Sequence, residues 1–111
     1  MRIFFDSSAM LKRYMPETGT PAVLHWLSQA DEVVLSVLTM PEVLSALNRL
    51  QREGVLSQDE YASARFRAFT DAVTSTIVDM THDVLERTVV CLERSPLRAS
   101  DAIHVASAVE A

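Results

Sequence analysis

The apolar residues of the chain fall into short runs and into helical spacings. Three runs predict β-strands, at Ile3–Phe5, Glu32–Ser36 and Ser75–Met80. Elsewhere, apolar residues recur every three or four positions, which is typical of amphipathic helices. Two predicted helices follow each strand. This alternation indicates an α/β fold with a central parallel sheet and helices packed on it.

Residues that start or stop helices separate the six predicted helices. Pro16 ends the first helix, Gly54 ends the third, and Ser57 with Glu60 forms a capping box for the fourth. We expect the following residues to form the buried helix faces: Val23, Trp26, Leu27 and Ala30; Met40, Val43, Leu44, Leu47 and Leu50; Ala62, Phe66, Phe69 and Val73; Leu85, Val89 and Leu92; Ile103, Ala106 and Val109.

Composition indicates one small folded domain over residues 1–111, because 49% of the residues are hydrophobic and only two are glycine. The formal net charge is −5, so overall charge does not attract nucleic acid, and RNA binding would need a local basic patch or metal ions. Cys91 is the only cysteine, which excludes an intramolecular disulfide. We expect a cytoplasmic protein, since no run is long enough to span a membrane and Asp6 interrupts the N-terminal apolar run.

Asp6 directly follows the first predicted strand. It therefore lies at the carboxyl end of that strand, where open α/β sheets form their ligand crevice. The alternative is a helix cap, because Asp before Ser-Ser-Ala suits an N-cap whose side chain accepts a backbone hydrogen bond. The other acids decide between these interpretations.

Two further acids lie near helix starts. Glu42 follows the second strand by a few residues, although Thr39 and Glu42 also match a capping box. Asp101 lies in the first turn of the last helix, where an acid also complements the helix dipole. Carboxylates gathered at one crevice repel one another and usually imply bound cations. Oxygen ligands without cysteine or a histidine pair favour Mg²⁺ or Mn²⁺.

Three motifs together resemble PIN domains, and most closely their VapC-type toxin branch in bacterial toxin–antitoxin pairs. The motifs are Ile3-Phe4-Phe5-Asp6-Ser7-Ser8-Ala9, Pro41-Glu42-Val43-Leu44-Ser45-Ala46-Leu47 with the preceding Leu35-Ser36, and Leu97-Arg98-Ala99-Ser100-Asp101-Ala102-Ile103-His104-Val105-Ala106. The third is the most specific. The resemblance implies a three-layered α/β/α fold and a metal-dependent endoribonuclease that hydrolyses RNA phosphodiester bonds.

The resemblance also assigns roles to residues and partners. Asp6, Glu42 and Asp101 match the acidic catalytic and metal-binding positions for Mg²⁺, or Mn²⁺. Ser8 matches a small polar position near the first acid, and Arg98 is a candidate phosphate contact or a solvated loop charge. The implied partners are an RNA substrate, a cognate antitoxin and a second copy of the chain, with no membrane.

His104 follows Asp101 by one helical turn, and we interpret it as a packing or hydrogen-bonding residue, not as a general base. Two rival hypotheses remain. One is a degenerate PIN-like module that binds RNA or a protein without cleavage. The other is a plain α/β domain whose three acids only cap helices.

The sequence departs from the PIN pattern at its C-terminal end. The family carries a further acid after a fourth strand that pairs beside the first, and residues 1–111 stop before it. We therefore expect a C-terminally incomplete domain in which the first strand has an exposed edge.

The departure predicts that residues 1–111 are not a self-sufficient monomer. Each large apolar side chain left unburied forgoes about 1.5–3 kcal/mol, and a small domain has little net stability to lose. Sedimentation and thermal unfolding of residues 1–111, compared with a chain that carries the next strand, test this. A cooperative monomer that is equally stable without that strand would contradict it.

Overall fold

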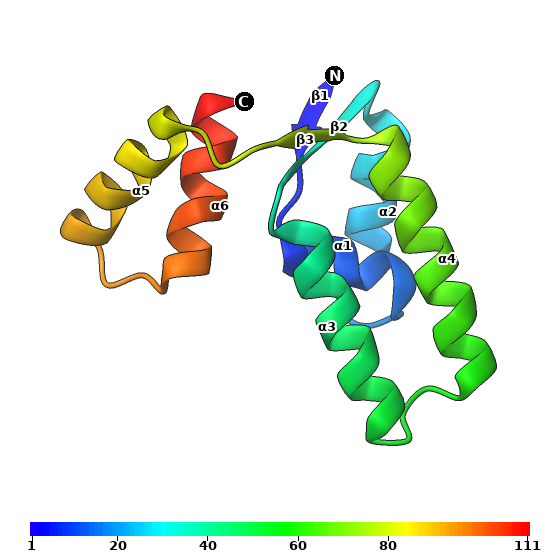
Figure 1. The fold of residues 1–111 in the computed structure, drawn as a ribbon. Coiled ribbons are helices and arrows are strands. Elements are labelled where there is room, and N and C mark those ends of the chain that lie inside the picture. The colour runs from blue at the N-terminus through cyan, green and yellow to red at the C-terminus, as the bar shows by residue number, and fades with distance from the viewer.

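The computed structural model describes all 111 residues and has the predicted alternation of strands and helices (Figure 1). Its elements are β1 (Arg2–Phe4), α1 (Ser7–Tyr14), α2 (Thr20–Gln29), β2 (Glu32–Ser36), α3 (Thr39–Arg52), α4 (Gln58–Thr74), β3 (Thr76–Val78), α5 (His82–Arg94) and α6 (Ala99–Glu110). The mixed α/β class predicted from the sequence is confirmed.

The three strands form one parallel sheet in the order β1-β2-β3. Ile3 pairs with Val33, and Leu35 pairs with Ile77. The strands run in the same direction, so the carboxyl ends of β1 and β2 lie at the same end of the sheet, where α1 and α3 begin. β1 lies at one side of the sheet and pairs only with β2.

The main hydrophobic core lies between the sheet and helices α1, α3 and α4. Met10 of α1, Leu35 of β2, and Val43 and Leu47 of α3 are almost completely buried there. The sequence of β2 forms a continuous apolar run because helices cover both faces of this strand. The core thus fixes the starts of α1 and α3 beside each other.

Helices α5 and α6 form a hairpin on the other side of the sheet (Figure 1). The buried residues of this hairpin are Val84 and Thr88 of α5 and Ala102, His104, Ala106 and Ser107 of α6. The hairpin contacts the sheet through α6, which packs against β2. The position of α6 therefore decides where its first turn, with Asp101, meets the other strand ends.

The predicted buried face of α4 is wrong. Phe66, Phe69 and Val73 are 73%, 56% and 86% exposed, and Ala62 is exposed as well. The inward face is a second stripe, in which Tyr61 is half-buried and the small residues Ala64, Ala68 and Ala72 let α4 pack closely against α3. This helix carries two stripes of apolar residues at helical spacing, and a prediction from hydrophobicity alone favours the stripe with the larger residues.

The predicted inner face of α5 is also wrong, since Leu85, Val89 and Leu92 are exposed while Val84 and Thr88 are buried. The true face is shifted by one residue, and Thr88 satisfies its hydroxyl on the Val84 carbonyl oxygen at 2.7 Å. A polar residue can thus take a core position in a helix. Two other residues expected in the core are exposed: Trp26 of α2 and Val109 of α6.

The corrected face of α4 can be tested by unfolding measurements. Leu47→Ala on the neighbouring helix α3 is the reference for a core residue, because it removes a completely buried side chain and should lower the free energy of unfolding by about 2–5 kcal/mol. Phe66→Ala should change it by no more than about 0.5 kcal/mol, since the ring is exposed. Urea denaturation of both variants gives the comparison, and a large loss for Phe66→Ala would restore the original assignment.

Candidate active site

A cleft of about 510 Å³ opens where β1 ends and α1, α3 and α6 begin or pass. Its polar and charged lining residues are Asp6, Ser7, Ser8, Glu42, Asp101 and His104. We call it the acidic cleft. The structure brings together all three acids singled out from the sequence, although up to 95 positions separate them, because β1, α3 and α6 each deliver one.

Asp6 is the N-cap of α1. Its Oδ1 accepts a hydrogen bond of 2.8 Å from the Ala9 backbone N–H, so the capping interpretation accounts for one oxygen. The side chain is exposed at the cleft, and Oδ2 accepts no hydrogen bond from the protein. Capping and ligand binding are therefore compatible at this residue.

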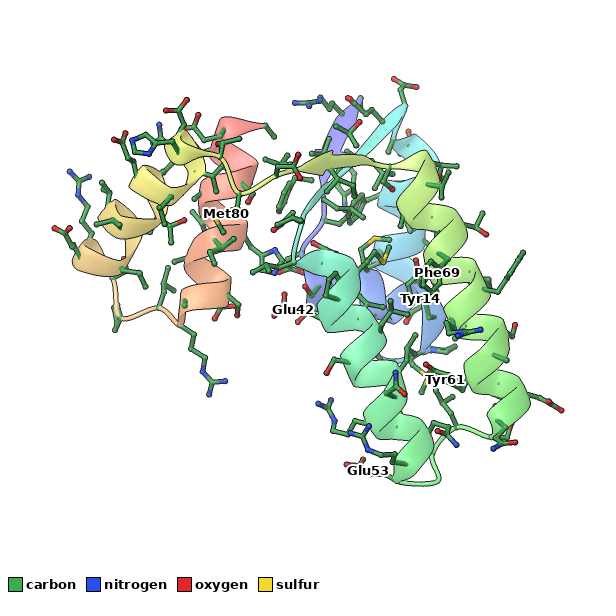
Figure 2. All side chains as sticks on the ribbon, in the orientation of Figure 1. Tyr14, Glu42, Glu53, Tyr61, Phe69 and Met80 are labelled. Atoms are coloured by element: carbon green, nitrogen blue, oxygen red, sulfur yellow. The ribbon has the colours of Figure 1, made fainter.

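Glu42 does not cap α3. Leu38 is the N-cap residue and Thr39 makes no side-chain cap. Glu42 instead turns to the cleft, at the N-terminal end of α3 on the side that faces α6 (Figure 2). Its Oε1 accepts a hydrogen bond of 2.7 Å from Ser7 Oγ and lies 2.6 Å from His104 Nε2. The capping-box hypothesis for Glu42 is wrong because tertiary donors take its place.

His104 is 7% exposed and joins α6 to two other elements. A carboxylate oxygen only accepts hydrogen bonds, so Nε2 carries the hydrogen that faces Glu42. Ser7 Oγ lies 3.1 Å from the same nitrogen. Nδ1 is buried without a hydrogen-bond partner. The ring is thus oriented by packing and by the contacts of Nε2 alone.

Burial raises the pKa of Glu42, but several opposing contacts outweigh it. Hydrogen bonds from Ser7 and His104, the charge of a protonated His104, and a hydrogen bond from Ser100 together hold the pKa below its ordinary value. Glu42 is therefore a carboxylate at neutral pH, with its negative charge directed to the cleft.

The other predicted site residues divide into two groups. Asp101 and Ser8 are exposed and line the acidic cleft. Arg98 is the N-cap position of α6 and does not line the cleft. Ser8 makes no side-chain hydrogen bond to an acid, whereas its neighbour Ser7 does.

The oxygen ligands that line the cleft suit a hard divalent cation, but the side chains that carry them do not form a tight cluster. No three histidine, cysteine, aspartate or glutamate side chains lie close enough together to hold a metal ion. Mg²⁺ commonly uses only one or two carboxylates and completes its six ligands with water and substrate phosphate. The donor set of the acidic cleft fits that requirement.

Sequence reasoning missed Ser7 and left His104 without a defined partner. The resemblance to the PIN motif points to Ser8 as the polar residue near the first acid, whereas the adjacent Ser7 is the one that contacts Glu42. The spacing of three between Asp101 and His104 did place both on one face of α6. Only the packing of α6 beside α1 and α3 shows that this face meets Glu42.

A family profile for the PIN domain matches residues 3–111 of the chain. The chain belongs to the PIN domain family. It is 32% identical over 108 residues to ribonuclease VapC45 and to ribonuclease VapC49, from two strains of Mycobacterium tuberculosis, covering 96% of this chain and 74% of each relative. These relatives place it in the VapC-type branch, as the three motifs indicated.

A solved structure has the same PIN fold. It is a toxin–antitoxin complex from Klebsiella pneumoniae, with a TM-score of 0.71 and 19% identity, and the match covers 95% of this chain and 76% of the other. At that identity the comparison supports the architecture of this PIN domain. None of its helices combines the length and the hydropathy needed to cross a membrane.

The lowered pKa of Glu42 predicts an acid-dependent contribution to stability. A carboxyl whose pKa is lower in the folded state stabilises the fold above its unfolded pKa and loses that contribution as the pH falls through its folded pKa. The stability difference between wild type and Glu42→Gln should therefore shrink as the pH falls below the ordinary glutamate pKa of about 4.3. Urea unfolding in metal-free buffer measures it, and a constant difference would contradict the assignment.

Proposed function

We propose that this PIN domain is a metal-dependent endoribonuclease and the toxin of a toxin–antitoxin pair. One observation carries the proposal: Asp6, Glu42 and Asp101, from three separate elements, line one cleft in a chain related to VapC ribonucleases. Mg²⁺ is the proposed cofactor, with Mn²⁺ as a substitute, because the cleft offers carboxylate and hydroxyl oxygens.

Asp6 and Asp101 are the proposed direct ligands, since both are exposed at the cleft. Glu42 would act directly or through a water molecule. When bound, the cation would lower the pKa of a water molecule and offset the charge on the attacked phosphate. The residues of the chain supply position: the Asp6 cap ties its carboxylate to α1, and Ser7 and His104 hold that of Glu42.

The remaining walls suit a nucleic-acid strand. Phe4, Val105 and Ala108 line the cleft and offer an apolar surface to a ribose or base. The three carboxylates repel phosphate without a cation, so binding of the strand depends on the metal. Arg98, beyond the cleft at the start of α6, is a candidate contact for a neighbouring phosphate.

Protein partners form part of the proposal. The solved relative in fold is a toxin–antitoxin complex, and the VapC names support an antitoxin for this chain. The exposed apolar residues of α4, Phe66, Phe69 and Val73, form the kind of surface that marks protein contacts. An antitoxin and a second copy are the proposed partners, in the cytoplasm. Binding without cleavage is the weaker alternative, because all three acids line one cleft.

The proposal predicts RNA cleavage that requires both metal and the acids. Wild type should cleave RNA with Mg²⁺ or Mn²⁺ and not with EDTA. Asp101→Asn should lower the rate at least about a hundredfold, since a metal supplies several kcal/mol of stabilisation. Asp83→Asn is the matched control, because Asp83 lies in the first turn of α5, as Asp101 does in α6, outside the cleft.

Asp6→Asn separates ligand from cap. Asn caps a helix about as well as Asp, so thermal stability without metal should be kept while cleavage is lost. Gel assays with a labelled RNA measure the rates. Cleavage in EDTA, equal losses for Asp83→Asn and Asp101→Asn, or full activity of Asp6→Asn would each reject the proposed mechanism.

A further inference from the structure

We infer that Ser7 and His104 restrict Glu42 to one available oxygen, and that this restriction makes the acidic cleft prefer Mg²⁺ over Ca²⁺. The inference rests on the proposed function, because it concerns the metal of the same cleft, and it takes Glu42 as a direct ligand of that metal. It assigns His104 a positioning role that does not require the histidine to transfer a proton.

The restriction follows from the hydrogen bonds on a single atom. Glu42 Oε1 receives Ser7 Oγ at 2.7 Å and His104 Nε2 at 2.6 Å. A carboxylate offers about four lone-pair positions, two on each oxygen. Ser7 and His104 occupy both positions of Oε1, and Ser100 is a further hydrogen-bond donor to this carboxylate, so at most Oε2 is left to approach a cation.

The position of Glu42 Oε1 is fixed by hydrogen bonds from two different helices. Ser7 belongs to the first turn of α1, and His104 belongs to α6. Glu42, on α3, cannot turn Oε1 to the cleft without breaking a hydrogen bond to each of these helices. The His104 ring is buried, and its second nitrogen has no other partner to which it could turn.

A carboxylate that offers one oxygen favours one kind of cation. Mg²⁺ requires nearly ideal octahedral geometry, takes one or two carboxylates and keeps several waters. Ca²⁺ takes six to eight oxygens and often binds a carboxylate through both of them. With Oε1 blocked, Glu42 can still bind a cation through one oxygen, which suits Mg²⁺. It can no longer bind Ca²⁺ through both oxygens. The pair of donors thus acts on metal choice through Glu42.

A purely structural role for His104 makes a different prediction. If the ring only fixes α6 to the rest of the fold, its replacement lowers stability and weakens all cations alike. If it blocks Oε1, its replacement changes the ratio of the Mg²⁺ and Ca²⁺ affinities. The ratio therefore separates the two roles.

The test uses isothermal titration of the whole chain with MgCl₂ and, separately, with CaCl₂. His104→Leu removes one donor and Ser7→Ala removes the other, and either should lower the Mg²⁺-to-Ca²⁺ affinity ratio about tenfold or more. His104→Gln keeps an N–H donor and should restore the ratio towards wild type. Thermal unfolding verifies that each variant is folded.

The chain contains a matched control. His82 Nε2 lies 2.9 Å from Glu86 Oε1 on the exposed surface of α5, away from the cleft. His82→Leu removes the same kind of histidine–glutamate contact and should leave the ratio unchanged.

Several results would overturn the inference. They are an unchanged ratio in folded His104→Leu, no recovery in His104→Gln, or an equal change in His82→Leu. If His104→Leu does not fold, Ser7→Ala decides, and a wild-type ratio there rejects the inference. Wild type that binds neither cation rejects the proposed function together with it. Wild type that binds Mg²⁺ with a ratio indifferent to both donors rejects the inference alone.

Discussion

The contact between His104 Nε2 and Glu42 Oε1 joins the two halves of this molecule. The hydrophobic core belongs to the side of α1, α3 and α4, whereas α5 and α6 pack mainly on each other. His104 Nε2 lies 2.6 Å from Glu42 Oε1 and also contacts Ser7, so these contacts tie α6 to α3 and α1. Asp101 lies one turn before His104, so this contact, together with the packing of α6 against β2, sets where the third acid meets the cleft.

The acidic cleft concentrates negative charge in a chain that is already acidic, with a net charge of −5. The fold offsets part of this locally, because Asp6 accepts a hydrogen bond from a backbone N–H and Glu42 Oε1 accepts hydrogen bonds from Ser7 and His104. These contacts stabilise ionised carboxylates and leave outward oxygens for a ligand. At Asp6 the helix cap uses Oδ1 and leaves Oδ2 without a protein donor, so one side chain can serve both the cap and the proposed cation site, and its local sequence fits both interpretations.

Sequence patterns predicted the strands well and the helix faces unevenly. The β-rich runs around Val34 and Ile77 form strands, because a short apolar segment between helices has few other ways to bury its side chains and pair its backbone groups. The face of α3 is also as predicted, since its apolar stripe has no competitor. On α4, Phe66 and Ala68 belong to rival stripes, and the space available beside α3 selected the smaller residues. Such a choice depends on interhelical distance, which no local pattern contains.

The sequence by itself determined the α/β class, the PIN motifs, the N-cap at Asp6 and the three acids as candidates. It could do so because capping, strand propensity and motif spacing are local properties of neighbouring residues. Only the tertiary structure decided that Glu42 faces Ser7 and His104 and not its own helix start. Hydrogen bonds between residues 35 and 62 positions apart form when helices from both sides of the sheet meet, and that meeting depends on packing across the whole chain.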